Sequence, residues 1–288
     1  MELTSKKVIQ ELLKKHQTIA LKRLGQNFLT NKGVINKIIE TAELSPEDII
    51  LEIGPGLGVL TWELAKKSKR VIAVEKDPKL VAILNNELKT KQIGNLEIIQ
   101  GDIRIRKSDT QEQRRVEKRF LSSTTQKYKI VANLPFYLTA AVIRQFLESE
   151  NPPEEMVLLM QKEVAQRICA KVPDMNLLAV SVQFYGQPKI ISYISKKSFW
   201  PSPKVDAAII KISAINQRRK SAFNQRFFKI VRVGFSQPRK QLINNLSKGL
   251  KLNRVKVDGW LKNNNIQPTQ RAETLAIKDW INLTKTLE

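Results

Sequence analysis

Short apolar runs alternate with longer amphipathic segments between residues 49 and 212. Seven short runs are candidate strands, and the first of them are rich in β-branched residues; the runs cover 49–53, 70–74, 96–100, 129–132, 156–160, 189–194 and 207–212. Apolar positions with helical spacing lie between them, at 60–67, 78–88, 139–147, 162–170 and 177–185. This alternation predicts an α/β fold, with a mainly parallel sheet that helices cover on both faces.

The pattern changes on both sides of this region. After residue 212 only helical spacing remains, at 223–233, 240–250, 255–263 and 277–287, beyond a basic segment at 217–220. Residues 1–23 have the spacing of a basic amphipathic helix. We therefore expect three parts: a basic helical extension at 1–23, an α/β domain at 24–215 and a small all-helical domain at 216–288. The charged stretch 104–127 lacks apolar periodicity and is expected to be a surface insertion.

Positive charge dominates the composition, with 50 Lys and Arg against 27 Asp and Glu, a net charge of +23. The excess is uneven, because residues 216–288 hold 16 basic and 4 acidic side chains, a net charge of +12. So much charge of one sign favours a polyanionic partner, nucleic acid first and an anionic membrane surface second. A basic surface that is merely solvated is the alternative that charge alone leaves open.

Histidine and cysteine are nearly absent, since His16 and Cys169 are the only residues of their types. This excludes a disulfide framework, Cys/His zinc sites, and nucleophilic catalysis by Cys–His or Ser–His pairs. We expect no metal site, so the chemistry must use carboxylates, amides, backbone groups or a reactive cofactor. The chain also lacks an apolar stretch of about 18 residues and a secretory signal pattern, which favours a cytoplasmic protein without a membrane span.

A glycine-rich turn follows the first predicted strand, where Gly54, Gly56 and Gly58 precede a helix. Glycines allow the backbone to approach a nucleoside closely, and this turn lies at the ligand-binding edge of such a sheet. The dinucleotide fingerprint does not fit, because its third glycine would fall on Val59, and no Gly-Lys-Ser/Thr follows for a phosphate loop. Taken alone, the glycines are equally compatible with an ordinary tight turn.

Carboxylates end the next two strands. Glu75 could accept hydrogen bonds from both hydroxyls of a ribose, and Asp102 from an adenine amino group while Ile103 packs on the ring. Each acid alone is equally typical of a helix N-cap. The ordered set of glycine turn and two strand-end acids predicts a nucleoside site.

The turn 132–137 follows a further strand and presents an amide beside an aromatic ring. Pro135 fixes the turn, and the Asn133 side-chain oxygen and Leu134 carbonyl could accept both N–H bonds of an adenine amino group while Phe136 stacks on the base. This amine is a poor nucleophile because its lone pair is delocalised into the ring. Attack on a sulfonium methyl needs no strong base, which suits a chain almost without histidine. An ordinary turn with core aromatics is the alternative.

Together these motifs resemble the ribosomal RNA adenine N6-dimethyltransferases. The matching segments are 24–29, 52–58, 74–77, 133–136, 161–167 and 199–206. The segments 234–246 and 271–275 look like the KsgA-type branch, which acts on small-subunit rRNA, rather than the Erm-type branch, which acts on large-subunit rRNA. The resemblance implies a Rossmann-like, seven-stranded S-adenosylmethionine methyltransferase sheet with a small all-helical C-terminal domain.

The resemblance also implies roles for particular residues. S-adenosylmethionine would be held by Gln26, Asn27, Leu29, Gly54, Gly56, Glu75, Lys76, Asp102, Ile103 and Asn133. The catalytic group would be Asn133, Leu134, Pro135, Phe136 and Phe199, with the target adenine between the two phenylalanines. RNA contacts would come from Lys204, Arg239, Lys240 and Arg271. The expected reaction is dimethylation of two adjacent adenines near the 3′ end of small-subunit rRNA, by a monomer acting on a pre-ribosomal particle.

The chain departs from the family pattern in three places. Phe136 stands where the family usually has tyrosine, Pro238 replaces the first residue of a basic triplet, and the segment between Asp102 and Asn133 is long. An Erm-type enzyme and a non-catalytic ribosome-assembly factor with the same fold are the alternatives. A NAD-dependent oxidoreductase is disfavoured by Val59 and by the charge.

Overall fold

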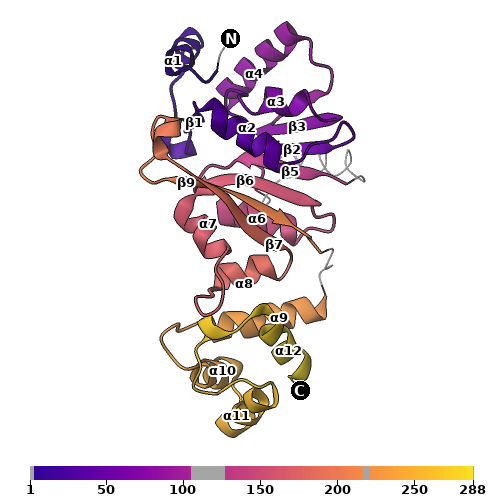
Figure 1. Ribbon diagram of the computed structural model, residues 1–288, viewed down its shortest axis with the longest axis vertical. Coiled ribbons are helices and arrows are strands. Elements are labelled where there is room, and N and C mark those ends of the chain that lie inside the picture. The colour runs from indigo at the N-terminus through magenta and orange to yellow at the C-terminus, as the bar shows by residue number, and fades with distance from the viewer. Residues whose placement is uncertain (1–2, 105–126, 217–220, 288) are drawn as a thin grey trace.

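The computed structural model describes residues 3–104, 127–216 and 221–287 (Figure 1). Nearly all of the predicted insertion and the basic segment 217–220 lie outside the described residues. Within the described ranges, none of the helices is long and apolar enough to cross a membrane.

All seven predicted strands are present and form one sheet. In spatial order they are β4 (Leu96–Gln100), β3 (Arg70–Glu75), β2 (Ile49–Ile53), β5 (Lys129–Asn133), β6 (Glu155–Gln161), β9 (Ala207–Ser213) and β7 (Gln187–Ile194). Neighbours pair in parallel except that β9 runs antiparallel to both β6 and β7. No α-helix lies between β7 and β9, so the chain turns back beside β7 in the opposite direction.

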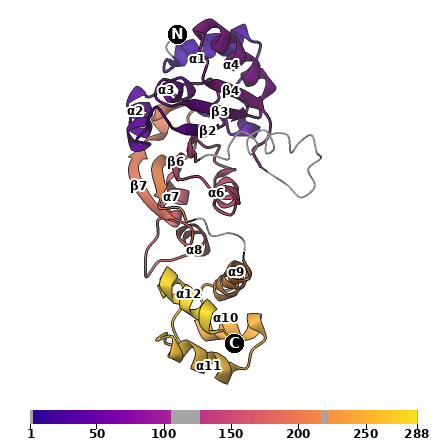
Figure 2. The same cartoon turned by 90° about the vertical axis from the view of Figure 1, so that its right-hand side faces the viewer.

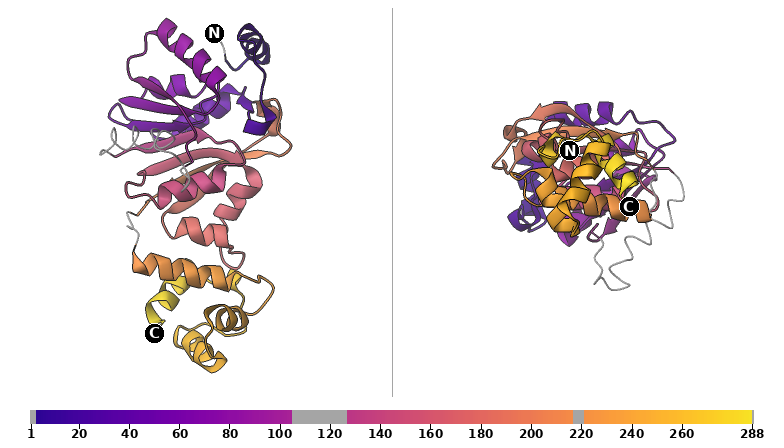
Figure 3. Two further views of the ribbon diagram at one scale, coloured as in Figure 1. Left: turned by 180° about the vertical axis from the view of Figure 1, so that it is seen from behind. Right: turned by 90° about the horizontal axis from the view of Figure 1, so that it is seen from below.

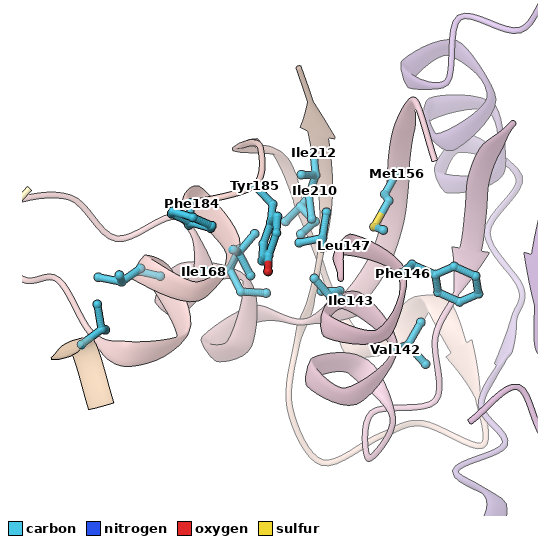
Figure 4. Packing of buried hydrophobic residues seen from close by; sticks show 14 of the residues in the cluster. Val142, Ile143, Phe146, Leu147, Met156, Ile168, Phe184, Tyr185, Ile210 and Ile212 are labelled. Carbon is cyan, nitrogen blue, oxygen red and sulfur yellow. The ribbon is translucent and has the colours of Figure 1, made fainter. Parts of the chain in front are cut away.

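Helices cover both faces of the sheet, as predicted. One face carries α1 (Lys6–Lys15), α2 (Lys32–Thr41), α3 (Thr61–Ala65) and α4 (Pro78–Lys91); the other carries α6 (Thr139–Leu147), α7 (Lys162–Ile168) and α8 (Leu177–Gln183). Because side chains alternate along a strand, Ile50 and Leu51 of β2 belong to different core clusters. Figure 2 shows α2 and α6 on opposite sides of β6. Figure 4 shows Ile143, Met156 and Ile210 gathered in one of these clusters.

Two N-terminal expectations need correction. The predicted helix at 1–23 is confined to α1, because the backbone at Gln17 turns to a positive φ of 49° and the chain then runs on without helix to a short 3-10 turn at Lys22–Leu24. Helix α2 was not predicted at all. Gly33 and several β-branched residues weaken its intrinsic helix propensity. The helical spacing of Val34, Ile35, Ile38 and Ile39, all buried, was the signal that could have revealed it.

The C-terminal region contains α9 (Ala222–Gly234), α10 (Leu242–Leu250), α11 (Arg254–Asn263) and α12 (Ile277–Thr286), close to the predicted ranges. These helices lie at one end of the molecule, below α8, as Figure 1 and the rear view in Figure 3 show. They are not separated from the α/β part by solvent. Phe227 of α9 stacks on Phe184 at the end of α8, with ring centroids 4.0 Å apart, and both rings are buried. One hydrophobic cluster therefore continues through both parts.

Candidate active site

One pocket at the carboxyl ends of the central strands collects the predicted site residues from six segments of the chain. Its lining includes all fourteen residues expected to hold the cofactor or act in catalysis: Gln26, Asn27, Leu29, Gly54, Gly56, Glu75, Lys76, Asp102, Ile103, Asn133, Leu134, Pro135, Phe136 and Phe199. Parallel strands bring their carboxyl ends to the same edge of the sheet, which explains why motifs far apart in sequence meet here.

The glycine turn after β2 forms the floor of this pocket. Gly54, Gly56 and Gly58 have positive φ angles of 69°, 63° and 85°, a region that side chains with a Cβ rarely adopt. At Gly58 an added Cβ would also lie 2.8 Å from the Trp62 ring. The turn thus needs glycine for its path, and it lines the pocket with backbone atoms that no Cβ covers.

Glu75 ends β3 and points its carboxylate into the turn. Its Oε2 accepts from the Gly56 N–H at 3.1 Å, and its Oε1 accepts from the Asp77 N–H at 2.8 Å. Burial raises the pKa of Glu75 above its ordinary value, and the two backbone donors oppose that shift. A carboxylate offers about four lone-pair positions, so Glu75 retains acceptor capacity for ribose hydroxyls.

Both carboxylate oxygens of Asp102 accept hydrogen bonds from neighbouring residues. Its Oδ1 accepts from the backbone N–H and Nε of Arg104, both at 3.0 Å, and its Oδ2 from Arg104 Nη2 at 2.7 Å and Lys76 Nζ at 3.0 Å. Burial acts to raise the pKa of Asp102, but these hydrogen bonds and the charge of Arg104 hold it well below its ordinary value. All of its roughly four lone-pair positions are used. Asp102 can accept from a cofactor amino group only after Arg104 or Lys76 releases an oxygen.

Asn133, at the end of β5, is held in one orientation. Its Nδ2 donates to the Asn27 carbonyl at 3.3 Å, and no described residue donates to its side-chain oxygen. The Leu134 N–H donates to the Leu159 carbonyl of β6 at 3.0 Å, and Leu138 N–H donates to the Pro135 carbonyl. The turn is therefore tied to the sheet while the amide oxygen of Asn133 stays available as an acceptor.

A short ladder that was not predicted carries Phe199 to the pocket. The strand β1 (Phe28–Leu29) pairs antiparallel with β8 (Phe199–Trp200), and Leu29 lies opposite Phe199. Leu29 and Phe199, which are distant in sequence, thus lie side by side in one wall of the pocket. Gln26 supports it, because its Oε1 accepts from the Leu21 N–H at 2.7 Å and its Nε2 donates to Asp77 at 2.8 Å.

Sequence reasoning assigned no role to Glu52, although it lies in the glycine motif. Glu52 is 1% exposed and lines the pocket, and its Oε2 has no hydrogen-bond partner among the described residues. Burial raises the pKa of its carboxyl to about 8. An acid within an otherwise apolar strand was the signal that could have identified it. S-adenosylmethionine fits this arrangement, because the ammonium group of its amino acid end can donate to the unpaired Glu52 oxygen, and its ribose hydroxyls can donate to Glu75.

The predicted RNA contacts lie outside the pocket, and all four side chains are exposed. Arg239 and Lys240 precede α10, and Arg271 lies beside them because the Leu242 N–H donates to the Gln270 carbonyl at 2.7 Å. Lys204 is elsewhere, in the loop between β8 and β9. Within 3–104, 127–216 and 221–287, no cluster of His, Cys, Asp or Glu could hold a metal ion.

A family model described as ribosomal RNA adenine dimethylase matches residues 19–288. The chain belongs to this family. A relative from Dehalococcoides mccartyi named ribosomal RNA small subunit methyltransferase A is 44% identical over 275 residues, which cover 94% of this chain and 89% of the relative. The protein is therefore an rRNA adenine dimethyltransferase that uses S-adenosylmethionine, which confirms the predicted enzyme class and cofactor. The NAD-dependent alternative is excluded.

Solved structures share the fold of this rRNA adenine dimethylase. A dimethyladenosine transferase from Plasmodium falciparum has a TM-score of 0.71 at 24% identity, covering 88% of this chain and 95% of that chain. The 23S rRNA methyltransferase ErmE has a TM-score of 0.69 at 24% identity, covering 90% and 98%. The predicted methyltransferase sheet with a helical C-terminal region is confirmed.

Glu52 makes stability depend on pH. Its folded-state pKa of about 8 exceeds the ordinary 4.5, so the folded chain binds this proton more tightly than the unfolded chain between these values. The free energy of unfolding of the cofactor-free protein should therefore fall as pH rises through this window, by about 1.4 kcal/mol per pKa unit. The variant Glu52→Gln should lose this decline in urea unfolding measured from about pH 5 to about pH 8.5, in steps of roughly half a pH unit.

The exposed Glu150→Gln variant is the matched control, because its carboxyl is solvated in both states. An identical pH profile for Glu52→Gln and the parent protein would show that Glu52 is ionised in the folded chain.

Proposed function

We propose that this enzyme dimethylates N6 of two adjacent adenines near the 3′ end of small-subunit rRNA, within a pre-ribosomal particle. The observation that carries the proposal is the oriented amide of Asn133, which lines the same pocket as Glu75 and the glycine turn and whose oxygen accepts from no described residue. The 44% identity with a relative named for the small subunit supports that substrate.

In the proposed mechanism the chain positions the amine rather than deprotonating it. The Asn133 oxygen and the Leu134 carbonyl accept the two N–H bonds of the target amine and favour a pyramidal nitrogen. Phe136 and Phe199 hold the base by stacking, and Pro135 keeps the turn rigid. When bound, S-adenosylmethionine supplies an electrophilic methyl group. The alkylated amine is acidic and loses its surplus proton to water, so no histidine is required.

The cofactor assignments and domain boundaries belong to the same proposal. S-adenosylmethionine is held by the ten residues that the sequence predicted and by Glu52, which the structure adds to them. The ten are Gln26, Asn27, Leu29, Gly54, Gly56, Glu75, Lys76, Asp102, Ile103 and Asn133. Residues 24–215 form the methyltransferase domain and 216–288 the rRNA-binding domain, with contacts from Lys204, Arg239, Lys240 and Arg271. Residues 1–23 form an extension whose Ile9, Leu12 and Leu13 pack into the methyltransferase core. The enzyme acts as a cytoplasmic monomer.

The decisive experiment is methylation of purified, unmethylated small and large ribosomal particles with labelled cofactor, followed by mapping of the modified adenines. We expect label in small-subunit rRNA only, with two methyl groups on each of two neighbouring adenines. Label confined to large-subunit rRNA would favour an Erm-type activity. Binding to the small particle without any methyl transfer would instead favour a pure assembly factor.

A further inference from the structure

A second concave surface lies beside the active-site pocket. It is formed by the end of α1, the segment after it, the start of α4 and β8, and we call it the flanking groove; the residues used below are Leu13, Lys14, Ile19, Arg23, Lys79 and Trp200. None of these residues belongs to the pocket that holds the cofactor and catalytic groups. The family match begins at residue 19, so α1 lies outside the segment that the family model covers.

The flanking groove directly adjoins the proposed adenine site. Phe199 lines the pocket and Trp200, the next residue of β8, lines the groove. Their Cα atoms are about 3.8 Å apart, and successive side chains of a strand point to opposite sides. Helix α1 also contributes to both the pocket and the groove, because Ile9 lines the pocket while Leu13 and Lys14 line the groove. A strand of nucleic acid with one base in the pocket therefore has its neighbouring nucleotides within reach of the groove.

The chemistry of the groove suits single-stranded RNA. Lys14, Arg23 and Lys79 are exposed cations, and no acidic side chain is among the groove's described lining residues. Trp200 is half-buried, with its ring roughly parallel to that of Phe28 at 6.5 Å, and Ile19 beside it is 70% exposed. Cations that follow a backbone together with an aromatic face are the usual recognition elements for unpaired nucleotides. An apolar peptide would offer no anionic group to these three cations.

The walls of the groove are already ordered. Leu13 is buried in the core, and the Thr18 N–H donates to its carbonyl at 2.9 Å. Lys79 Nζ donates to the Gln17 carbonyl at 2.8 Å, which joins the start of α4 to the segment after α1. A nucleotide bound here would meet a formed surface and would not have to order a loop.

We propose that the flanking groove binds the RNA nucleotides next to the target adenine, with Trp200 stacking on a base and the cations contacting phosphates. This inference rests on the proposed function, because it assigns the partner of the same active site. It gives the enzyme a means of holding the strand while one of two adjacent adenines occupies the pocket.

The test is equilibrium binding of the full-length chain to unmethylated small-subunit particles across a salt series, which needs no catalysis. The variant Lys14→Gln/Arg23→Gln removes two exposed cations and spares Lys79, whose contact with Gln17 is structural. We expect a roughly ten-fold weaker Kd and a slope of log Kd against log salt smaller by about 1.4, or about 0.7 for each phosphate of a single strand that is no longer neutralised. The control Lys67→Gln/Lys89→Gln removes two exposed cations outside the groove and should stay within about two-fold of the parent.

Trp200 is tested separately, because it also packs on Phe28. Trp200→Ala should weaken particle binding, and Trp200→Phe should restore most of it, since stacking needs an aromatic face. Cofactor affinity measured by calorimetry should be unchanged in every groove variant that is folded.

The proposal would be overturned if the Lys14→Gln/Arg23→Gln variant bound particles with the same Kd and the same salt slope as the control variant. Loss of binding to phosphatidylglycerol vesicles without a change in particle binding would assign the groove to a lipid surface instead. A parent protein that binds particles without methylating them would refute the proposed function, while the groove would still be judged by its own binding data.

Discussion

Replacing Asn133 by alanine is expected to lower the rate of methyl transfer by about 10³-fold or more while the Kd for S-adenosylmethionine rises only modestly. The amide oxygen is the acceptor proposed to orient the target amine, and its loss removes an interaction that matters most when the nitrogen becomes pyramidal. Among the described residues the amide nitrogen donates only to the Asn27 carbonyl, at 3.3 Å, so much of the cofactor wall should remain. Single-turnover methylation of small-subunit particles and calorimetry with the cofactor give the two quantities.

Two comparison variants sharpen this result. Asn133→Asp keeps oxygen acceptors at the same position and should retain part of the activity that alanine loses. Asn86→Ala, on the exposed side of α4, should behave like the parent protein. Turnover by Asn133→Ala close to that of the parent would remove the amide from the mechanism.

Binding to ribosomal particles should weaken by about 10³-fold or more when salt rises from 50 to 200 mM, provided about 6–10 phosphates are neutralised. The cause is that a basic surface releases counterions condensed on the RNA when it binds, and this release is less favourable when the salt concentration is high. The chain has a net charge of +23, and Arg239, Lys240 and Arg271 lie together on its C-terminal surface. Filter-binding titrations at several salt concentrations measure the slope directly.

The same titrations can locate the charges responsible. Arg239→Gln/Lys240→Gln should reduce the slope by about 1 for each phosphate that the variant no longer neutralises. Cofactor affinity should vary little over the same range, because the pocket binds one small molecule and not a polyanion. A flat response of particle binding to salt would contradict an electrostatic role for the C-terminal region.

Much of the fold could be predicted because burial leaves a local periodicity. Strands 49–53 and 96–100 were both predicted with their observed bounds. The first is covered on both faces, so its residues form an apolar run that only Glu52 interrupts. The helix at 139–147 was equally clear from its spacing. The reversed direction of β9 was not visible, because a strand's own residues do not record which neighbour it pairs with.

The candidate active site could likewise be predicted only in part. Its motifs could be placed in one pocket from sequence, because strand-end positions of a parallel sheet share an edge. The full engagement of Asp102 by Arg104 and Lys76 and the orphaned oxygen of Glu52 could not be foreseen. Hydrogen-bond saturation depends on which side chains meet in space, and sequence spacing alone does not determine it.

By itself, then, the sequence determined the sheet, the covering helices, the basic character and the order of the motifs, since each is encoded in neighbouring residues. The tertiary structure decided which distant segments touch. It paired Phe28 with Trp200, joined the C-terminal helices to the core through Phe184 and Phe227, and set the flanking groove beside the adenine site. These contacts arise from packing between segments far apart in the chain, where no local pattern specifies the partner.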